Sequence, residues 1–282
     1  MKVGVPKEVK AGERRVALVP EAAKKLVDKG FEVVIESGAG AEAHLGDADY
    51  QETGAATGSA ADAWAADAVL KVAPPEPAES LRAGSLLIGF LNPLGDPQLV
   101  RRLAAERVTA FAMEAIPRTT RAQSMDALSS QAVVAGYRAT LAGAQGLGKF
   151  FPMLTTAAGT VRPARVLVLG AGVAGLQAIA TSRRLGAMVE AYDVRPAVKE
   201  EVQSLGAKFV QIEVQQEGEG TGSGEYAKEV SEDVQRRQQQ LLADRVAAAD
   251  VVITTAAVPG RPSPQPGPRP PSPGASRAPS RR

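Results

Sequence analysis

The stretch RVLVLGAGVAGLQAIATSRRLGAMVEAYDV, Arg165 to Val194, decides the fold of its part of the chain. An apolar run is followed by a glycine-rich turn, a helix-like segment and a second apolar run that ends in Asp193. The turn, Gly170–Gly175, reads GAGVAG and matches the spacing G-x-G-x-x-G. A strand before such a turn and a helix after it indicate a βαβ unit of the kind that binds dinucleotides.

Each glycine of this turn has a predicted task. Gly170 allows the tight turn, Gly172 lets the backbone approach a pyrophosphate, and Gly175 lets the helix pack on the strand. Asp193 follows Gly172 by 21 residues, where an acid bonds the adenosine ribose and repels a 2′-phosphate. NAD(H) is therefore favoured over NADP(H), although Arg195 leaves a 2′-phosphate contact open. The competing interpretation is a glycine turn that serves helix–strand packing alone.

The composition excludes several kinds of site. The 282 residues, 44% of them apolar, suffice for one large or two ordinary domains. The chain has no cysteine, so neither a disulfide framework nor a thiolate metal site is expected. His44 is the single histidine, and its small-residue surroundings predict a surface position rather than a catalyst. No metal site is predicted.

The termini and the charge indicate a soluble, cytoplasmic chain. The opening MKVGVPKEVK lacks the apolar core of a signal peptide, and no apolar run approaches the ~20 residues that span a bilayer. The net charge of +2 includes five arginines and no acid in residues 259–282, which leaves −3 for residues 1–258. Nucleic acid is therefore not an expected partner.

Segments of strand and helix character alternate along the rest of the chain, which predicts an α/β fold with two Rossmann-like parallel-sheet domains joined by a long helix. The predicted domains are residues 1–128, residues 129–258, and a disordered tail rich in Pro, Arg and Ser at 259–282. The predicted strands are 2–5, 31–36, 67–72, 84–92, 109–114, 165–170, 188–193, 208–212 and 250–254. The predicted helices are 20–30, 97–108, 129–150 (the joining helix), 173–185, 196–205 and 225–248.

Two further polar stretches are candidate binding sites. The loop 6–20, after the first strand, carries Lys7, Glu8, Glu13, Arg14 and Arg15, and Lys71 ends a later strand. In open parallel sheets the loops at the carboxyl ends of the strands line the ligand crevice. The alternative is solvated surface charge. The stretch 121–130, RAQSMDALSS, either caps the joining helix or recognises the carboxamide of a nicotinamide.

Together these motifs resemble one family. PKE…GERRVALVP, PRTTRAQSMDALSSQ, FPMLTTAAGTVRPARVLVLGAGVAGLQAIATSRRLGA, DVRPAVKEEVQSLGAKFV and GEYAKE are similar to the NAD-binding domain of proton-translocating NAD(P) transhydrogenases, in order from Met1 to about Gly260. The RAQSMD and GEYAKE loops are the specific parts. The resemblance implies NAD(H) bound here, NADP(H) on a separate beta subunit, direct hydride transfer between them, and coupling to proton movement by a membrane subunit.

The resemblance also implies residue roles. Arg118, Gln123, Asp126 and Ser129 would surround the nicotinamide, and Gln123 would lie near the partner subunit. Tyr226 would lie on a mobile loop that closes over the nucleotide. The adenosine and pyrophosphate half would be held by Gly170, Gly172, Val173, Ala174, Gly175, Asp193 and Arg195. A homodimer, peripheral to the inner membrane through its partners and without insertion of its own, is also implied.

Two other functions stay open. In alanine dehydrogenase, a near relative of this family, Arg15 and Lys71 would contact the carboxylate and carbonyl of the substrate. That enzyme also needs a histidine after the strand that corresponds to 84–91, where this chain has Asn92 and no histidine. The third possibility is a nucleotide-binding fragment without turnover. The change to Pro, Arg and Ser after TTAAVPG resembles a shifted reading frame or a wrongly assigned terminus, which would leave the second domain incomplete, with weak NAD binding and poor turnover expected. The alternative is a native disordered tail.

Overall fold

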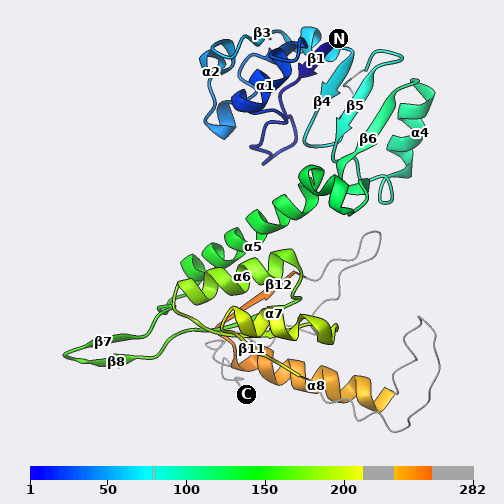
Figure 1. The fold of residues 1–282 in the computed structure, drawn as a ribbon. Coiled ribbons are helices and arrows are strands. Elements are labelled where there is room, and N and C mark those ends of the chain that lie inside the picture. Colours follow the sequence, from blue (N-terminus) through cyan, green and yellow to red (C-terminus); the bar gives the residue numbers. More distant parts are fainter. Residues whose placement is uncertain (78, 80, 212–231, 256–282) are drawn as a thin grey trace, which may run out of the picture. The chain divides into compact units, whose positions relative to one another are not determined.

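The computed structural model describes residues 1–77, 79, 81–211 and 232–255, with only the helical backbone for 232–239. These residues form two compact units, Met1–Leu128 and a second that begins at Ser129 (Figure 1). Each unit is an α/β structure built on a parallel sheet, which confirms the predicted fold class.

The first unit holds a six-stranded sheet in the order β3-β2-β1-β4-β5-β6, with every neighbouring pair parallel. The two sides of the sheet are wound outward from β1 and β4. Loops that follow these two strands therefore meet at the topological switch point, where open parallel sheets bind ligands. The strands are β1 (Lys2–Val5), β2 (Glu32–Glu36), β3 (Ala56–Gly58), β4 (Ala68–Leu70), β5 (Leu86–Gly89) and β6 (Thr109–Ala112).

The helices of this unit are short, and its core is aliphatic apart from Tyr50. Tyr50 is fully buried beside β1 and β2, and its hydroxyl donates to the carbonyl of Leu18 at 2.8 Å. Burial raises the pKa of this phenol to about 12, with Asp49 and Asp47 adding to the effect. The helices are α1 (Pro20–Val27), α2 (Asp47–Gln51), α3 (Ala60–Trp64) and α4 (Pro97–Ala105), with 3-10 turns at Ala41–Ala43, Met113–Ala115 and Thr120–Met125.

Several predicted boundaries in the first unit were wrong. The strands predicted at 67–72, 84–92 and 109–114 are shorter, and the last turns into a 3-10 helix at Met113. The helix predicted to reach residue 108 ends at Ala105, because Arg107 adopts a left-handed conformation with φ of 58°. β3, α2 and α3 were not predicted.

The second unit holds a four-stranded parallel sheet in the order β11-β10-β9-β12. β9 (Arg165–Leu169) precedes the glycine turn and β10 (Met188–Tyr192) follows the next helix, as the sequence predicted, and β12 (Val251–Thr254) lies on the other side of β9. β11 is only Lys208–Phe209, shorter than the predicted 208–212. The switch point of this sheet lies between β9 and β12, directly at the glycine turn.

The joining helix α5 (Ala127–Gly146) begins and ends slightly earlier than predicted. α6 (Val173–Arg184) follows the glycine turn, and the segment 196–205 is a 3-10 turn (Pro196–Val198) followed by α7 (Lys199–Ser204) rather than one helix. An antiparallel hairpin that the sequence did not predict joins β7 (Leu154–Thr156) to β8 (Gly159–Val161) and extends away from the rest of the unit (Figure 1).

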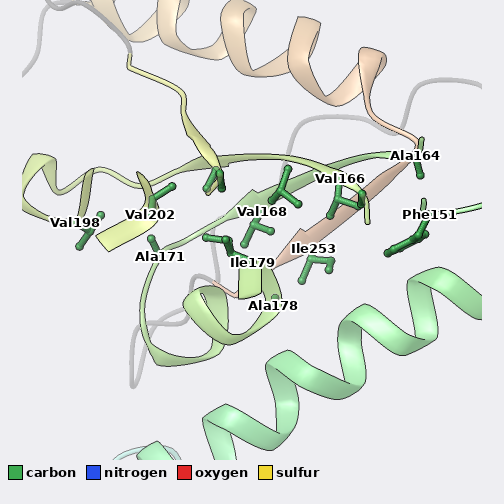
Figure 2. Packing of buried hydrophobic residues seen from close by; sticks show 14 residues of the cluster. Phe151, Ala164, Val166, Val168, Ala171, Ala178, Ile179, Val198, Val202 and Ile253 are labelled. Carbon is green, nitrogen blue, oxygen red and sulfur yellow. The ribbon is translucent and has the colours of Figure 1, made fainter. Parts of the chain in front are cut away.

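The core of the second unit lies between α6 and the sheet (Figure 2). Val166 and Val168 from β9 pack there with Ile179 from α6 and Ile253 from β12, all at most 5% exposed. α8 (Glu232–Ala248) is tied to the sheet by Arg245, whose Nη1 lies 3.1 Å from a carboxylate oxygen of Glu190. This core fixes the end of β9, from which the glycine turn leaves.

Some predicted features lie outside the described residues: residues 225–231 at the start of the helix predicted for 225–248, the loop that carries Tyr226, and the tail at 259–282. Among the helices of the described residues, none combines the length and the apolarity needed to cross a bilayer.

Candidate functional site

The glycine turn is held in a conformation that other residues would not adopt. Gly170 has a φ of +98°, and its N–H donates to the carbonyl of Tyr192 at 2.8 Å. A Cβ on Gly175 would lie 1.8 Å from the carbonyl oxygen of Gly170. The hydroxyl of Thr255 donates to that same carbonyl at 3.0 Å. The strand, the turn and the first turn of α6 are therefore in backbone contact, which only glycine allows at Gly170 and Gly175.

The N-terminus of α6 is open. Gly172 is the N-cap, no side chain caps the helix, and a Cβ at Gly172 would have no atom within 4 Å. The N–H groups of the first turn of a helix have no partner within the helix, and the helix dipole adds partial positive charge there. Val173 and Ala174, the first two residues of α6, present such N–H groups. This end of α6 therefore has both the space and the donors for a phosphate.

Asp193 stands at the end of the neighbouring strand and faces the turn. Its Oδ2 accepts the N–H of Ala171 at 2.7 Å, and its Oδ1 accepts the N–H of Arg195 at 2.9 Å. The guanidinium of Arg195 binds both oxygens, Nε to Oδ1 at 3.0 Å and Nη2 to Oδ2 at 3.1 Å. Burial works to raise the pKa of Asp193, but the hydrogen bonds from Arg195 and the two amides outweigh it and lower the pKa. The carboxylate is thus kept ionised beside the glycine turn.

α5 packs closely against α6 through small residues. A Cβ on Gly136 would lie 2.1 Å from the carbonyl oxygen of Ala174. One turn later the buried hydroxyl of Thr140 donates to the carbonyl of Ala178, at 3.2 Å, and lies 3.4 Å from the hydroxyl of Ser182. The position of the α6 N-terminus therefore depends on α5.

The residues expected at the nicotinamide lie in the first unit, except for Ser129. Arg118, Gln123 and Asp126 line one hollow of about 260 Å³ in the 3-10 segment before α5. Ser129 is the third residue of α5, belongs to the second unit, and is not among the lining residues. The glycine turn, Asp193 and Arg195 lie in the second unit, where the structure brings them together.

Glu114 is a lining residue that the sequence did not single out. One of its carboxylate oxygens accepts the N–H of Asn92, and the other is buried without a hydrogen-bond partner. Asn92 is in a left-handed conformation with φ of 49°, and its side-chain amide is so close to Gly95 that a Cβ there would lie 2.3 Å from Nδ2. The signal in the sequence was only the pair of an Asn after one strand and a Glu after the next.

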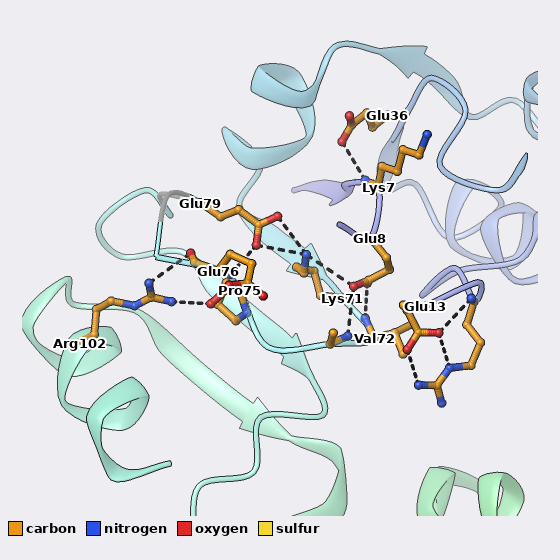
Figure 3. Close-up of polar contacts among 12 residues, drawn as sticks. Lys7, Glu8, Glu13, Glu36, Lys71, Val72, Pro75, Glu76, Glu79 and Arg102 are labelled. Atoms are coloured by element: carbon orange, nitrogen blue, oxygen red, sulfur yellow. Dashed lines mark hydrogen bonds and ion pairs between the residues drawn. The ribbon is translucent and has the colours of Figure 1, made fainter. Parts of the chain in front are cut away.

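The charged loop at the switch point of the first sheet forms a buried ionic cluster (Figure 3). The side chain of Lys71 is 1% exposed, and its Nζ lies 3.1 Å from Glu79 and 3.6 Å from Glu8. Glu8 also accepts the N–H of Val72 at 2.6 Å. The interpretation as solvated charge was therefore wrong for Glu8 and Lys71, whereas Arg14 is exposed as that interpretation requires.

Arg15 and His44 also have defined positions. The guanidinium of Arg15 makes two hydrogen bonds to Glu13, Nε to Oε1 at 2.7 Å and Nη2 to Oε2 at 2.6 Å. This contact lowers the pKa of Glu13 against the opposing effect of burial. His44 is exposed, as predicted, and ends a 3-10 turn. Across the residues that the structure describes, no three His, Asp or Glu side chains gather in a way that could hold a metal ion.

Comparison with known proteins places this geometry in a family. Residues 4–135 match the N-terminal domain, and residues 139–265 the C-terminal domain, of the family described as alanine dehydrogenase/PNT. Over 273 residues the chain is 48% identical to the first part of NAD(P) transhydrogenase subunit alpha from Rhodospirillum rubrum, a match that covers 94% of this chain and 71% of that protein. The crystal structure of transhydrogenase from Sinorhizobium meliloti superposes with a TM-score of 0.84 at 47% identity, covering 94% of this chain and 72% of that one.

The chain belongs to the NAD(P) transhydrogenase alpha-subunit family.

Alanine dehydrogenase is a more distant relative of this transhydrogenase-family chain. A solved L-alanine dehydrogenase superposes with a TM-score of 0.76 at 30% identity, covering 94% of this chain and 68% of that one. The NAD(P) transhydrogenase subunit alpha of Haemophilus influenzae is 45% identical over 267 residues, and this chain spans about half of it, 52% of its length. The C-terminal family match runs to residue 265 and so includes the first residues of the predicted tail.

Proposed function

We propose that this chain is the NAD(H)-binding component of a proton-translocating NAD(P) transhydrogenase. The observation that carries the proposal is the open N-terminus of α6 beside the carboxylate of Asp193, in a chain of the transhydrogenase alpha-subunit family. Here NAD(H) is a substrate, held on one subunit while its hydride moves to or from NADP(H) on another.

The pyrophosphate of NAD(H) lies on the first turn of α6 in this proposal. Gly172, Val173 and Ala174 offer backbone N–H groups there, and Gly170 and Gly175 keep the turn tight against the helix. Asp193 receives the hydroxyls of the adenosine ribose, and Arg195 stands beside them. An ionised carboxylate at this position disfavours a 2′-phosphate, which makes NAD(H) the nucleotide of this chain.

The nicotinamide end is assigned to Arg118, Gln123, Asp126 and Ser129. The support is the resemblance of RAQSMDALSSQ to the family motif, and the shared hollow lined by the first three residues. Tyr226, assigned to a loop that closes over the nucleotide, lies outside the described residues. Gln123 is assigned a second role at the face toward the partner subunit.

The reaction needs no acid or base from the chain. The C4–H bond of NADH breaks with its electron pair, and a C4–H bond forms on NADP⁺, so that NADH is oxidised and NADP⁺ reduced without release of a proton. What the protein supplies is approach and orientation of the two rings. A chain with one exposed histidine and no cysteine suits this chemistry.

The proposed partners follow from this division of labour. An NADP(H)-binding beta subunit accepts the hydride, and a membrane-domain subunit couples the exchange to proton translocation. The chain itself is proposed to act as a homodimer in the cytoplasm, peripheral to the inner membrane through these partners, without nucleic acid and without insertion of its own.

The test combines binding with isotope transfer. NADH is titrated into the purified 282-residue chain, and NADH deuterated at C4 is then supplied with NADP⁺ and the beta subunit. We expect the chain alone to bind NADH more tightly than NADPH. We expect deuterium to reach NADPH, without loss to water, only when the beta subunit is present as well. Binding without transfer in the complete complex would favour a nucleotide-binding fragment; deuterium loss to water would exclude direct transfer.

The alanine dehydrogenase alternative is tested with the same preparation. Lys71 is already paired with Glu8 and Glu79, Arg15 with Glu13, and Asn92 stands where that enzyme is expected to have a histidine. Pyruvate and ammonium should therefore not cause NADH oxidation. Alanine formed in proportion to NADH consumed would establish this second function.

A further inference from the structure

The hydrogen-bonding capacity of Asp193 is fully used within the chain. A carboxylate offers about four acceptor positions. Ala171 and Arg195 fill two of them with backbone N–H groups, and Nε and Nη2 of Arg195 fill the other two. A ribose diol that is to bond Asp193 therefore finds no acceptor position vacant.

The four bonds differ in how easily they break. The two backbone N–H donors belong to the glycine turn and to the chain just after β10, so they cannot leave Asp193 without a change in the path of the main chain. The guanidinium belongs to a side chain that is 59% exposed, whereas the Asp193 side chain is 7% exposed. The guanidinium is thus the group that leaves, since it moves into water without disturbing the core.

We propose that Arg195 is an internal competitor for the ribose site, and that NAD(H) binds by exchanging the ribose hydroxyls for the guanidinium on Asp193. This inference rests on the proposed nucleotide site and deepens it. Arg195 then has two opposite effects: it weakens NAD(H) binding by occupying the carboxylate, and it stays close enough to neutralise part of the charge that Asp193 presents to a 2′-phosphate. Arg195 therefore lowers the discrimination between NAD(H) and NADP(H).

The experiment compares Arg195→Ala and Arg195→Lys with the wild-type chain. Kd values are measured by fluorescence titration for NADH and NADPH, and by competition for 5′-ADP and 2′,5′-ADP, which isolate the adenosine half. In Arg195→Ala we expect NADH to bind about two- to five-fold more tightly, the range for loss of a partly exposed ion pair. NADPH should bind about ten-fold more weakly, since a charge-assisted contact is lost. Arg195→Lys keeps the positive charge but not the two-pronged guanidinium, and should leave the Kd for NADPH close to that of the wild-type chain.

Arg184→Ala is the matched control, because Arg184 lies in the last turn of α6, away from the glycine turn, and is exposed. It removes the same charge and should leave the Kd ratio unchanged. If Arg195→Ala weakens NADH, Arg195 binds the nucleotide rather than competing with it, and the inference is overturned. An unchanged ratio overturns it too. If the wild-type chain binds neither nucleotide, the proposed function itself fails, and this outcome is visible before any variant is made.

Discussion

At the scale of single residues, the glycines of the turn serve two purposes: Gly175 is needed for helix–strand packing, whereas Gly172 leaves space for a ligand. A Cβ on Gly175 would meet backbone at 1.8 Å, whereas a Cβ on Gly172 would meet nothing. Gly172→Ala should therefore fold with unchanged or slightly higher stability, by up to ~1 kcal/mol, because the unfolded chain loses freedom. It should nevertheless lose NADH binding, because the new methyl group fills the space for the pyrophosphate.

Gly175→Ala is the companion change and should lower the free energy of unfolding by ~1–3 kcal/mol, the range for overpacking. Urea unfolding and NADH titration of both variants separate the two effects. Normal NADH binding by Gly172→Ala would show that the nucleotide does not approach this turn.

Asp193 gives a prediction for the dependence of stability on pH. Burial works to raise its pKa in the folded chain, but Arg195 and two amides hold the pKa below its ordinary value. A carboxylate of this kind adds stability that is present above its unfolded pKa, ~3.9, and is lost as the pH falls through the lower folded value. The difference in unfolding free energy between wild type and Asp193→Asn should therefore shrink below about pH 4. A difference that stays constant in urea titrations from about pH 7 to about pH 2.5 would contradict these hydrogen bonds.

At the scale of elements, α5 positions the N-terminus of α6 through the close contact at Gly136. Gly136→Ala would bring a Cβ within 2.1 Å of the backbone of α6, so the two helices must move apart. We expect a loss of ~1–3 kcal/mol in unfolding free energy and weaker NADH binding, since the α6 N-terminus moves with its helix. Gly146→Ala, at the end of α5 with no atom within 4 Å of the new Cβ, is the control. Tight NADH binding by a destabilised Gly136→Ala chain would show that the nucleotide site does not depend on the packing of α5 against α6.

Elements were predictable from sequence where periodicity had enough residues to show itself. β9 carries a continuous apolar run, β10 a mostly apolar one interrupted by Glu190, and α6 about three helical turns, while the glycines mark where strand and helix meet. β3, α2 and α3 have three to five residues each, too few for a period, and were missed. The hairpin β7–β8 was missed for another reason: its residues are all exposed, so no alternation of apolar and polar side chains records it.

At the scale of the whole molecule, the sequence predicted contacts between neighbouring strands but not contacts between loops. Asp193 and the glycine turn follow neighbouring parallel strands joined by one helix, so their separation in the sequence was enough to predict that they lie side by side. The contact of Glu114 with Asn92 joins residues 22 apart at the ends of β5 and β6. The contacts of Lys71 with Glu8 and Glu79 depend likewise on how loops return to the sheet. A sequence shows that these charges exist, but not which of them meet.

The cluster at the centre of the first sheet therefore carries the last prediction. Lys71→Met would leave Glu8 and Glu79 facing each other without a cation in a site that is 12% exposed or less. Breaking a buried pair in this way typically costs ~3–5 kcal/mol, so unfolding in urea should begin at clearly lower concentration. The control is Lys25→Met, whose partner Glu21 is 83% exposed and whose loss should cost no more than ~1 kcal/mol. If Lys71→Met is as stable as the control, the lysine is not held by these carboxylates in solution and is available to the carbonyl of a substrate, as the alanine dehydrogenase alternative requires.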